Sequence, residues 1–135
     1  MCLTITNRTP QIAKKDIVCY KVLRHNFLKR SGYTTPYMYT SVTLGELMED
    51  KVPVKIHNSI FLVKYNLYEG VFHTFKYYSD AVEMCKEDII GNSVVVRCII
   101  PKGTEYYVGT WGEVISCYGS KQLQYTKKVL KRFEE

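Results

Sequence analysis

The sequence predicts a single α+β domain, mostly antiparallel sheet with one main helix packed on it. A β-branched run at 94–100 ends at Pro101, and two further apolar runs follow at 106–111 and 114–116 with glycines between them. This spacing is typical of a strand meander. The one clear helical pattern lies at 79–91, and a length of 135 residues suits one domain.

The N-terminal part of the chain predicts one strand between two irregular segments. Residues 1–15 are expected to be a leader or an edge segment, so that the domain itself spans 16–135. Residues 16–24 predict a strand with apolar side chains on both faces, which indicates an interior strand. The stretch 25–36 is polar, basic and contains glycine, and it predicts a long loop.

The remaining sheet elements are predicted as short pieces. In chain order they are an aromatic strand at 37–42, a helical turn or a bend at 44–48, strand pieces at 52–56 and 59–63, and a strand at 67–75 that breaks at Gly70. The final apolar segment at 122–130 is either a closing strand or a tail helix.

The helix at 79–91 is predicted from its ends and its apolar face. Ser79 is a typical N-cap residue, and Asp80 places a carboxylate at the positive end of the helix dipole. Gly91 follows the last turn, as a C′ residue does. The apolar face consists of Val82, Cys85 and Ile89. We expect this face to cover the sheet.

The cysteines and the apolar runs indicate the compartment. Five cysteines are spread without a CxxC pair, which predicts buried thiols, no metal site and a reducing environment. The apolar runs are far shorter than the ~20 residues that span a bilayer. The start has no apolar block of the secretory kind. We therefore expect a cytoplasmic protein without a membrane partner.

The charge and the tyrosine content favour a binding function. Lysine and arginine outnumber the acids 19 to 13, giving a net charge of +6, and there are twelve tyrosines. Tyrosine supplies contact area for proteins and for stacked bases alike. We expect a protein partner first and a nucleic acid second. The predicted contact residues are Arg24, Lys29, Arg30, Tyr33 and Tyr37.

Three positions are candidates for chemistry. His73 ends a strand just before the helix, where an imidazole can meet a ligand or bond a backbone carbonyl. Glu113 follows Trp111-Gly112 at the start of a strand, as a catalytic, ribose-binding or simply exposed carboxylate. Arg24 and His25 end the first strand, where one of the two can hold an anion.

The run 95–109, after the Gly70 to Phe75 strand and the helix containing Asp80-Ala81, resembles small uncharacterised domains of gut bacteria and their phages. The likeness covers roughly 16–125, and its motif is structural. That family has no activity to transfer, so the resemblance implies only a phage-associated protein. Together with the charge and the tyrosine content, we expect a small binding or accessory protein that engages a macromolecular partner through a basic, tyrosine-rich surface, with no cofactor.

The order of several motifs is also similar to that of the ADP-ribosyltransferase fold. This weaker resemblance implies an NAD-binding enzyme as the alternative function, with Arg24 or His25, His73 and Glu113 as catalytic residues. The chain departs from that family in having no clear Ser-Thr-Ser or Glu-x-Glu element. The enzyme hypothesis requires these residues to line one cleft, whereas the binding hypothesis does not.

Overall fold

The described part of the chain is mainly β-strand. The computed structural model describes residues 3–5, 7–26, 32–34, 41–58, 65–86, 93–112 and 114–132. Its strands are β1 (Leu3–Ile5), β2 (Gln11–Ile12), β3 (Ile17–Asn26), β4 (Gly32–Thr34), β5 (Ser41–Val42), β6 (Leu47–Glu49), β7 (Lys55–Asn58), β8 (Tyr65–Glu69), β9 (Phe72–Phe75), β10 (Ser93–Ile100), β11 (Glu105–Trp111), β12 (Ile115–Ser120) and β13 (Gln122–Arg132). The helix of the described residues is α1 (Tyr78–Lys86).

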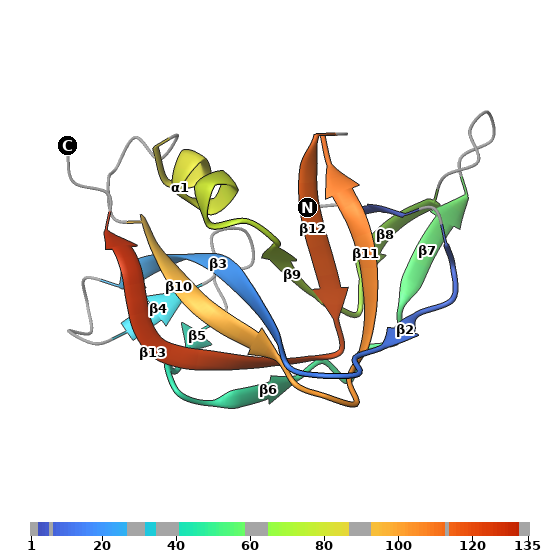
Figure 1. Cartoon of the computed structure of the whole chain (residues 1–135), viewed down its shortest axis with the longest axis horizontal. Coiled ribbons are helices and arrows are strands. Elements are labelled where there is room, and N and C mark those ends of the chain that lie inside the picture. Colours follow the sequence, from blue (N-terminus) through green and yellow to red (C-terminus); the bar gives the residue numbers. More distant parts are fainter. Residues whose placement is uncertain are drawn as a thin grey trace.

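These strands join into one antiparallel sheet. Its order is β6-β13-β10-β3-β9-β12-β11-β1-β8-β7, with β2 beside β11 and with β4 joining β3 to β5. Figure 1 shows β3, β10 and β13 curving along one side, β11 and β12 standing on the other, and α1 above β3 and β10. The predicted single domain of antiparallel sheet with a packed helix is confirmed. Its balance is mostly β rather than an even α+β mixture.

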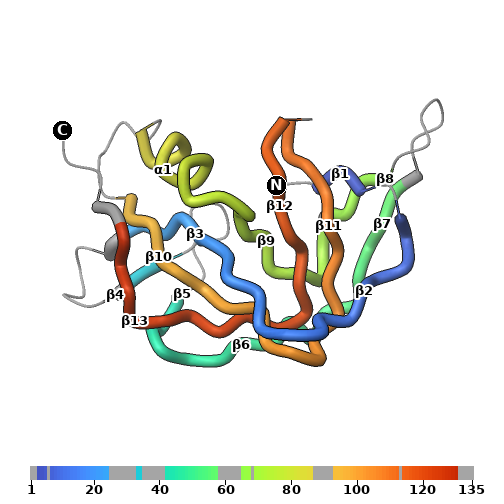
Figure 2. The backbone as a smooth tube through the Cα atoms, viewed as in Figure 1, coloured from blue at the N-terminus to red at the C-terminus, as the bar shows by residue number. Residues whose placement is uncertain are grey.

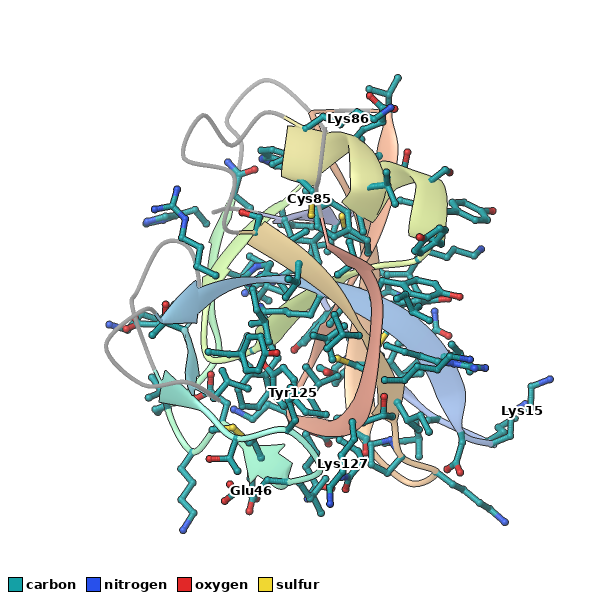
Figure 3. All side chains as sticks on the ribbon, turned by 90° about the vertical axis from the view of Figure 1, so that its left-hand side faces the viewer. Lys15, Glu46, Cys85, Lys86, Tyr125 and Lys127 are labelled. Atoms are coloured by element: carbon teal, nitrogen blue, oxygen red, sulfur yellow. The ribbon has the colours of Figure 1, made fainter. Side chains whose placement is uncertain are left out.

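Two clusters of buried side chains hold the sheet together. The first core contains Ala13, Cys19, Leu23, Val42, Val94, Val96, Cys98, Ile100, Tyr118, Leu123 and Tyr125. The second core contains Leu3, Ile5, Leu67, Val71, Phe75, Ala81, Cys85, Val95, Tyr107 and Cys117. Figure 3 labels one member of each, Tyr125 and Cys85.

Strand β10 divides the two cores because its side chains alternate between the faces of the sheet. Val94 and Val96 belong to the first core, and Val95 belongs to the second. Strand β3 pairs with β10 along its length without a break in register, so that Cys19 lies directly opposite Cys98 on the first-core face. Burial on both faces explains the continuous β-branched run and confirms β3 as an interior strand.

Helix α1 covers the second core. It begins at Tyr78, one residue before the predicted start, and its buried side chains are Ala81 and Cys85. Figure 3 shows Cys85 beneath the helix and Lys86 on its outer side. The packing of this helix on the sheet is confirmed. Ile89 and Gly91, assigned to its last turns, lie outside the described residues.

The C-terminal strands form where predicted, but the meander is wrong for β10. Strands β11 and β12 are neighbours, whereas β10 lies between β3 and β13. The turn after β10 explains the difference. Thr104 N–H donates to the Pro101 carbonyl at 3.1 Å, and the Gly103 N–H donates to the Ala13 carbonyl at 2.8 Å. These bonds direct the chain beside the Ala13 segment instead of back along β10.

The segment expected to be a leader or an edge segment belongs to the sheet. Strand β1 lies between β11 and β8, as the dark blue tube beside β8 shows in Figure 2. Leu3 and Ile5 alternate with Thr4, so both face the second core and are about 1% exposed. Their burial accounts for the position of β1 inside the sheet rather than at its edge.

Three other segments differ from their predictions or decide between them. The predicted loop at 25–36 contains the end of β3 and the paired strand β4, while 27–31 and 35–40 lie outside the described residues. The predicted helical turn or bend at 44–48 contains the start of strand β6, which pairs with β13. The segment 122–130 is a strand because Leu123 and Tyr125 both enter the first core.

Candidate functional site

Three exposed or half-exposed tyrosines gather where β3 meets the start of α1. Tyr20 and Tyr78 contact edge to face, with 5.7 Å between ring centroids and 62° between ring planes. Tyr77 and Tyr78 are 51% and 38% exposed. We name this surface the tyrosine strip. Its members are Val18, Tyr20, Lys76, Tyr77, Tyr78 and Arg97.

The strip combines apolar area with positive charge. Val18 is 38% exposed and shares a face of β3 with Tyr20, and Arg97 lies directly opposite Tyr20 on β10. The Lys76 ammonium lies 5.4 Å from the Tyr77 ring centroid, a cation–π contact. Such a surface offers rings, an aliphatic side chain and two cations to a partner.

Of the five residues predicted to bind a partner, the structure describes Arg24 and Tyr33. Arg24 lies near the end of β3, opposite Thr34, and Tyr33 of β4 packs partly buried against the first core. Lys29, Arg30 and Tyr37 lie outside the described residues. Within the described ranges, the tyrosine strip is the better-formed aromatic and cationic surface, and sequence reasoning missed it.

Two of the three residues of the NAD hypothesis are described. Alternation along β3 places Arg24 on the second-core face with Tyr20 and Val22. His73 of β9 lies two residues before Phe75 and so shares its face of the strand, which is the second-core face. Glu113 lies outside the described residues. The shared cleft that would distinguish the enzyme hypothesis therefore stays a prediction.

His73 is a largely structural histidine in its geometry. Its ring hydrogen-bonds the backbone of Leu67, and its Nε2 is buried with no hydrogen-bond partner among the described residues. Burial, helped by the nearby charge of Lys21, lowers the pKa of His73 to about 4, although the hydrogen bond to Leu67 acts in the opposite direction. The ring is therefore neutral at physiological pH.

Lys21 is the least expected side chain of the first core. It lies on β3 between Cys19 and Leu23, on the face that both of them turn into the first core. Its Nζ donates a hydrogen bond of 2.7 Å to the His73 carbonyl. Burial lowers the pKa of Lys21, and the thiols of Cys98 and Cys19 oppose this effect.

The thiols around Lys21 are buried, as predicted. Burial raises the pKa of Cys19 to about 11, and it raises the pKa of Cys98 further. Cys85 and Cys117 are also buried free thiols, whereas Cys2 lies outside the described residues. In the described residues, no group of three or more His, Cys, Asp and Glu side chains is arranged to hold a metal ion.

Comparison with known proteins gives no relative from which a function can be transferred. No protein-family model matches the chain, and no curated protein or solved structure is similar to it. Across the described ranges, no helix has the length and apolar character that crossing a membrane requires.

Proposed function

We propose that this protein is a small binding protein whose tyrosine strip contacts an acidic surface of a partner protein. The observation that carries the proposal is the exposure of Tyr77 and Tyr78. Tyr78 contacts Tyr20, which shares its face of β3 with the exposed Val18, and Lys76 lies over the Tyr77 ring. Single exposed apolar side chains are ordinary, but contiguous groups of them mark interaction sites. The proposal names no cofactor.

The residue types in the strip are those that supply binding energy at protein interfaces. Tyrosine and arginine are enriched among the side chains whose truncation costs most affinity. Tyr20 and Tyr78 already contact each other in the free protein, so the strip loses less side-chain freedom on binding. Two prearranged rings next to a third exposed ring therefore support a protein contact.

The ring arrangement favours a protein over a nucleic acid. Base stacking needs open ring faces aligned along a strand. Lys76 covers a face of the Tyr77 ring, and the 62° angle between Tyr20 and Tyr78 gives no parallel platform. Val18 adds a branched aliphatic side chain, which has no role in stacking and suits an apolar protein contact.

The charge of the protein favours an acidic partner surface. The chain carries a net charge of +6, and Lys76 and Arg97 bring two cations to the strip. Complementary charge raises association rates and rejects partners of like charge. Binding through the strip should therefore weaken as salt concentration rises.

The test compares capture by two matched variants. Lys76→Ser combined with Tyr77→Ser removes one cation and one exposed apolar side chain from the strip. The control, Arg8→Ser combined with Val114→Ser, removes the same two classes elsewhere, since Arg8 also lies 5.4 Å from a tyrosine ring and Val114 is 85% exposed. Wild type and both variants are immobilised separately and exposed to an extract of the source cells.

We expect wild type and the control to capture a protein that the strip variant does not retain. Capture by wild type should also weaken as the salt concentration rises. Melting curves of both variants should match wild type. Equal capture of every protein by the strip variant overturns the proposal. A labelled single-stranded oligonucleotide that binds wild type and loses affinity with the strip variant overturns it in favour of nucleic-acid binding.

A further inference from the structure

A row of side chains crosses four neighbouring strands on the outside of the sheet. Strands β3, β10, β13 and β6 lie side by side in this order (Figure 1). Residues directly opposite each other on antiparallel strands point to the same face. Four residues are linked in this way, and we name them the outer row: Val18 lies opposite Ile99, Ile99 opposite Gln124, and Gln124 opposite Leu47.

The outer row points away from the first core. Its neighbours along the strands, such as Ile17, Cys98 and Met48, belong to the first core or pack against it, and no member of the outer row does. Leu47 is 50% exposed and Val18 is 38% exposed, while Ile99 and Gln124 keep intermediate exposure. Three aliphatic side chains and one amide therefore lie in line on an accessible face.

The outer row continues the tyrosine strip. Val18 belongs to both, and the next cross-strand pair on the same face is Tyr20 with Arg97. Beyond that pair, α1 covers this face over Val22 and Val95. The described residues supply no second helix that covers the outer row beside α1.

The spacing of the outer row matches the turns of an α-helix. Neighbouring strands lie about 4.8 Å apart, and a helix advances about 5.4 Å per turn. Side chains at i, i+4, i+7 and i+11 lie on one face of a helix, so each can meet the next strand. An extended chain repeats its side chains on one face only every 7 Å or so, which fits the row less well.

The charges near the row differ between its two ends. Arg97 lies two residues before Ile99 on the same face of β10, so it favours a carboxylate at the β3 end. Glu49 lies two residues after Leu47 on the same face of β6, so it favours a cation at the β6 end. A matching helix is therefore acidic in its first turn and basic in its last, or the reverse if it runs in the opposite direction.

Gln124 makes the third position of the row polar. Its amide nitrogen donates to the Gly45 carbonyl at 2.9 Å and to the Tyr125 carbonyl at 3.2 Å. The amide oxygen of Gln124 is left to accept a hydrogen bond from a partner. The helix position above it should therefore carry a donor rather than an apolar side chain.

We propose that the outer row binds an amphipathic helix of the partner protein, which crosses strands β3, β10, β13 and β6. This inference rests on the proposed function and adds the form of the partner. The helix carries apolar side chains at three of its four contact positions, a donor above Gln124, and carboxylates near Arg97. A second copy of this chain does not supply it through α1, because Ala81 and Cys85 of that helix are buried in its own core.

The test uses two synthetic helical peptides labelled with a fluorophore. The first has Leu at i, i+4 and i+11, Gln at i+7, Glu in the turn that meets β3 and Lys in the turn that meets β6. The second keeps the Leu and Gln positions and exchanges Glu with Lys. Fluorescence anisotropy at low salt should show that wild type binds the first peptide several-fold more tightly than the second.

Two matched variants locate the peptide on the sheet. Leu47→Ser removes the β6 end of the outer row. The control is Ile12→Ser, which removes an isomeric side chain of nearly equal exposure, 53% against 50%, from the short strand β2. Leu47→Ser should bind the first peptide about fivefold or more weakly than wild type, whereas Ile12→Ser should bind it as wild type does.

Three results would overturn the inference: no binding of the first peptide to wild type, equal affinity for both peptides, or equal affinity of Leu47→Ser and wild type. The first two are read from wild type and do not depend on how a variant folds. None of the three affects the proposed function, which the strip variant tests by capture. Conversely, a strip variant that captures every protein, while Leu47→Ser alone loses the peptide, would refute the proposed function and leave the helix site in place.

Discussion

The two cores are built from opposite faces of the same strands, yet they differ in chemistry. In the second core, Leu3, Ile5 and Leu67 pack with Ala81 of the helix. Each core also contains two cysteines and buried tyrosine, but in the first core Cys19 and Cys98 lie directly opposite each other, and the Lys21 amine shares their face of β3. The helix covers only the second core.

This difference shows how one sheet can bury an amine on one of its faces. Both cores are stabilised by apolar area and tolerate few voids. An amine in such surroundings needs a hydrogen-bond partner, and Lys21 finds one in the His73 carbonyl of the neighbouring strand β9. The alternation of β3 keeps this amine on the face opposite the helix.

The largest expected effect tests the second core. Leu67 is fully buried, and Leu67→Ala should lower the free energy of unfolding by about 3 to 4 kcal/mol through lost transfer energy and a residual cavity. Cys98→Ala, equally buried in the first core, removes one sulfur atom and should cost much less. Urea unfolding of both variants measures the difference, and a loss for Leu67→Ala no larger than that for Cys98→Ala would show that Leu67 is not packed in a buried cluster.

His73, whose backbone carbonyl accepts the Lys21 hydrogen bond, should make stability depend on pH. The pKa of His73 is about 4 in the folded protein against 6.5 unfolded, so the unfolded state binds more protons between these values. Stability should fall by up to about 3 kcal/mol as pH drops from 6.5 to 4, with no further loss from this residue below that.

The control for this pH dependence is His73→Asn, which removes the titration. Urea midpoints of both proteins across the same pH range separate the contribution of this histidine to the pH dependence from that of the carboxylates. Identical pH slopes in the two proteins would mean that the imidazole is not desolvated in the folded state.

Gly109 tests the position of β1 beside β11. A Cβ at this residue would meet the Thr4 carbonyl oxygen, and it would come within 2.9 Å of side-chain atoms of Leu3 and Ile5. Gly109→Ala should therefore cost about 2 kcal/mol by forcing β1 away from β11. Gly103→Ala is a poor control because of its positive φ, so Val108→Ala at an exposed position of β11 serves instead. A thermal melt of Gly109→Ala that equals the control would contradict an interior β1.

The smallest expected effect has the opposite sign. Lys21→Met keeps the side-chain length and removes a poorly compensated charge, so it should raise stability at neutral pH by about 1 to 2 kcal/mol. Because the pKa of Lys21 is lowered in the folded protein, wild-type stability rises with pH up to the unfolded value of 10.5, and the gain should shrink over that range. A loss of stability in this variant would show that the bond to the His73 carbonyl outweighs the burial cost.

Sequence patterns predicted where helices and strands lie along the chain better than which strands pair in the sheet. The β-branched run of β10, the break at Gly70 and the helix start near Ser79 depend on residues close in the chain, and all three are found. The place of β10 between β3 and β13 depends on pairing across the whole chain, which periodicity does not encode.

The candidate surfaces follow the same division. The tyrosine strip combines Tyr20 of β3 with Tyr77 and Tyr78, which are far away in the sequence. No local sequence motif could therefore predict it. The position of Lys21 was visible in the sequence, because it shares one predicted strand face with Ile17, Cys19 and Leu23. Only the structure shows that the Lys21 amine bonds the His73 carbonyl on β9.

The interior position of β1 has a consequence for biosynthesis. Thr4 pairs with Asn66 of β8 and with Thr110 of β11, so the ribosome must complete nearly the whole domain before β1 has both neighbours. Until then, Leu3 and Ile5 are apolar side chains on a nascent segment, and β8 presents an unpaired edge. Such non-local pairing slows folding and exposes strand edges to aggregation. The earliest-made strand is thus among the last to be secured.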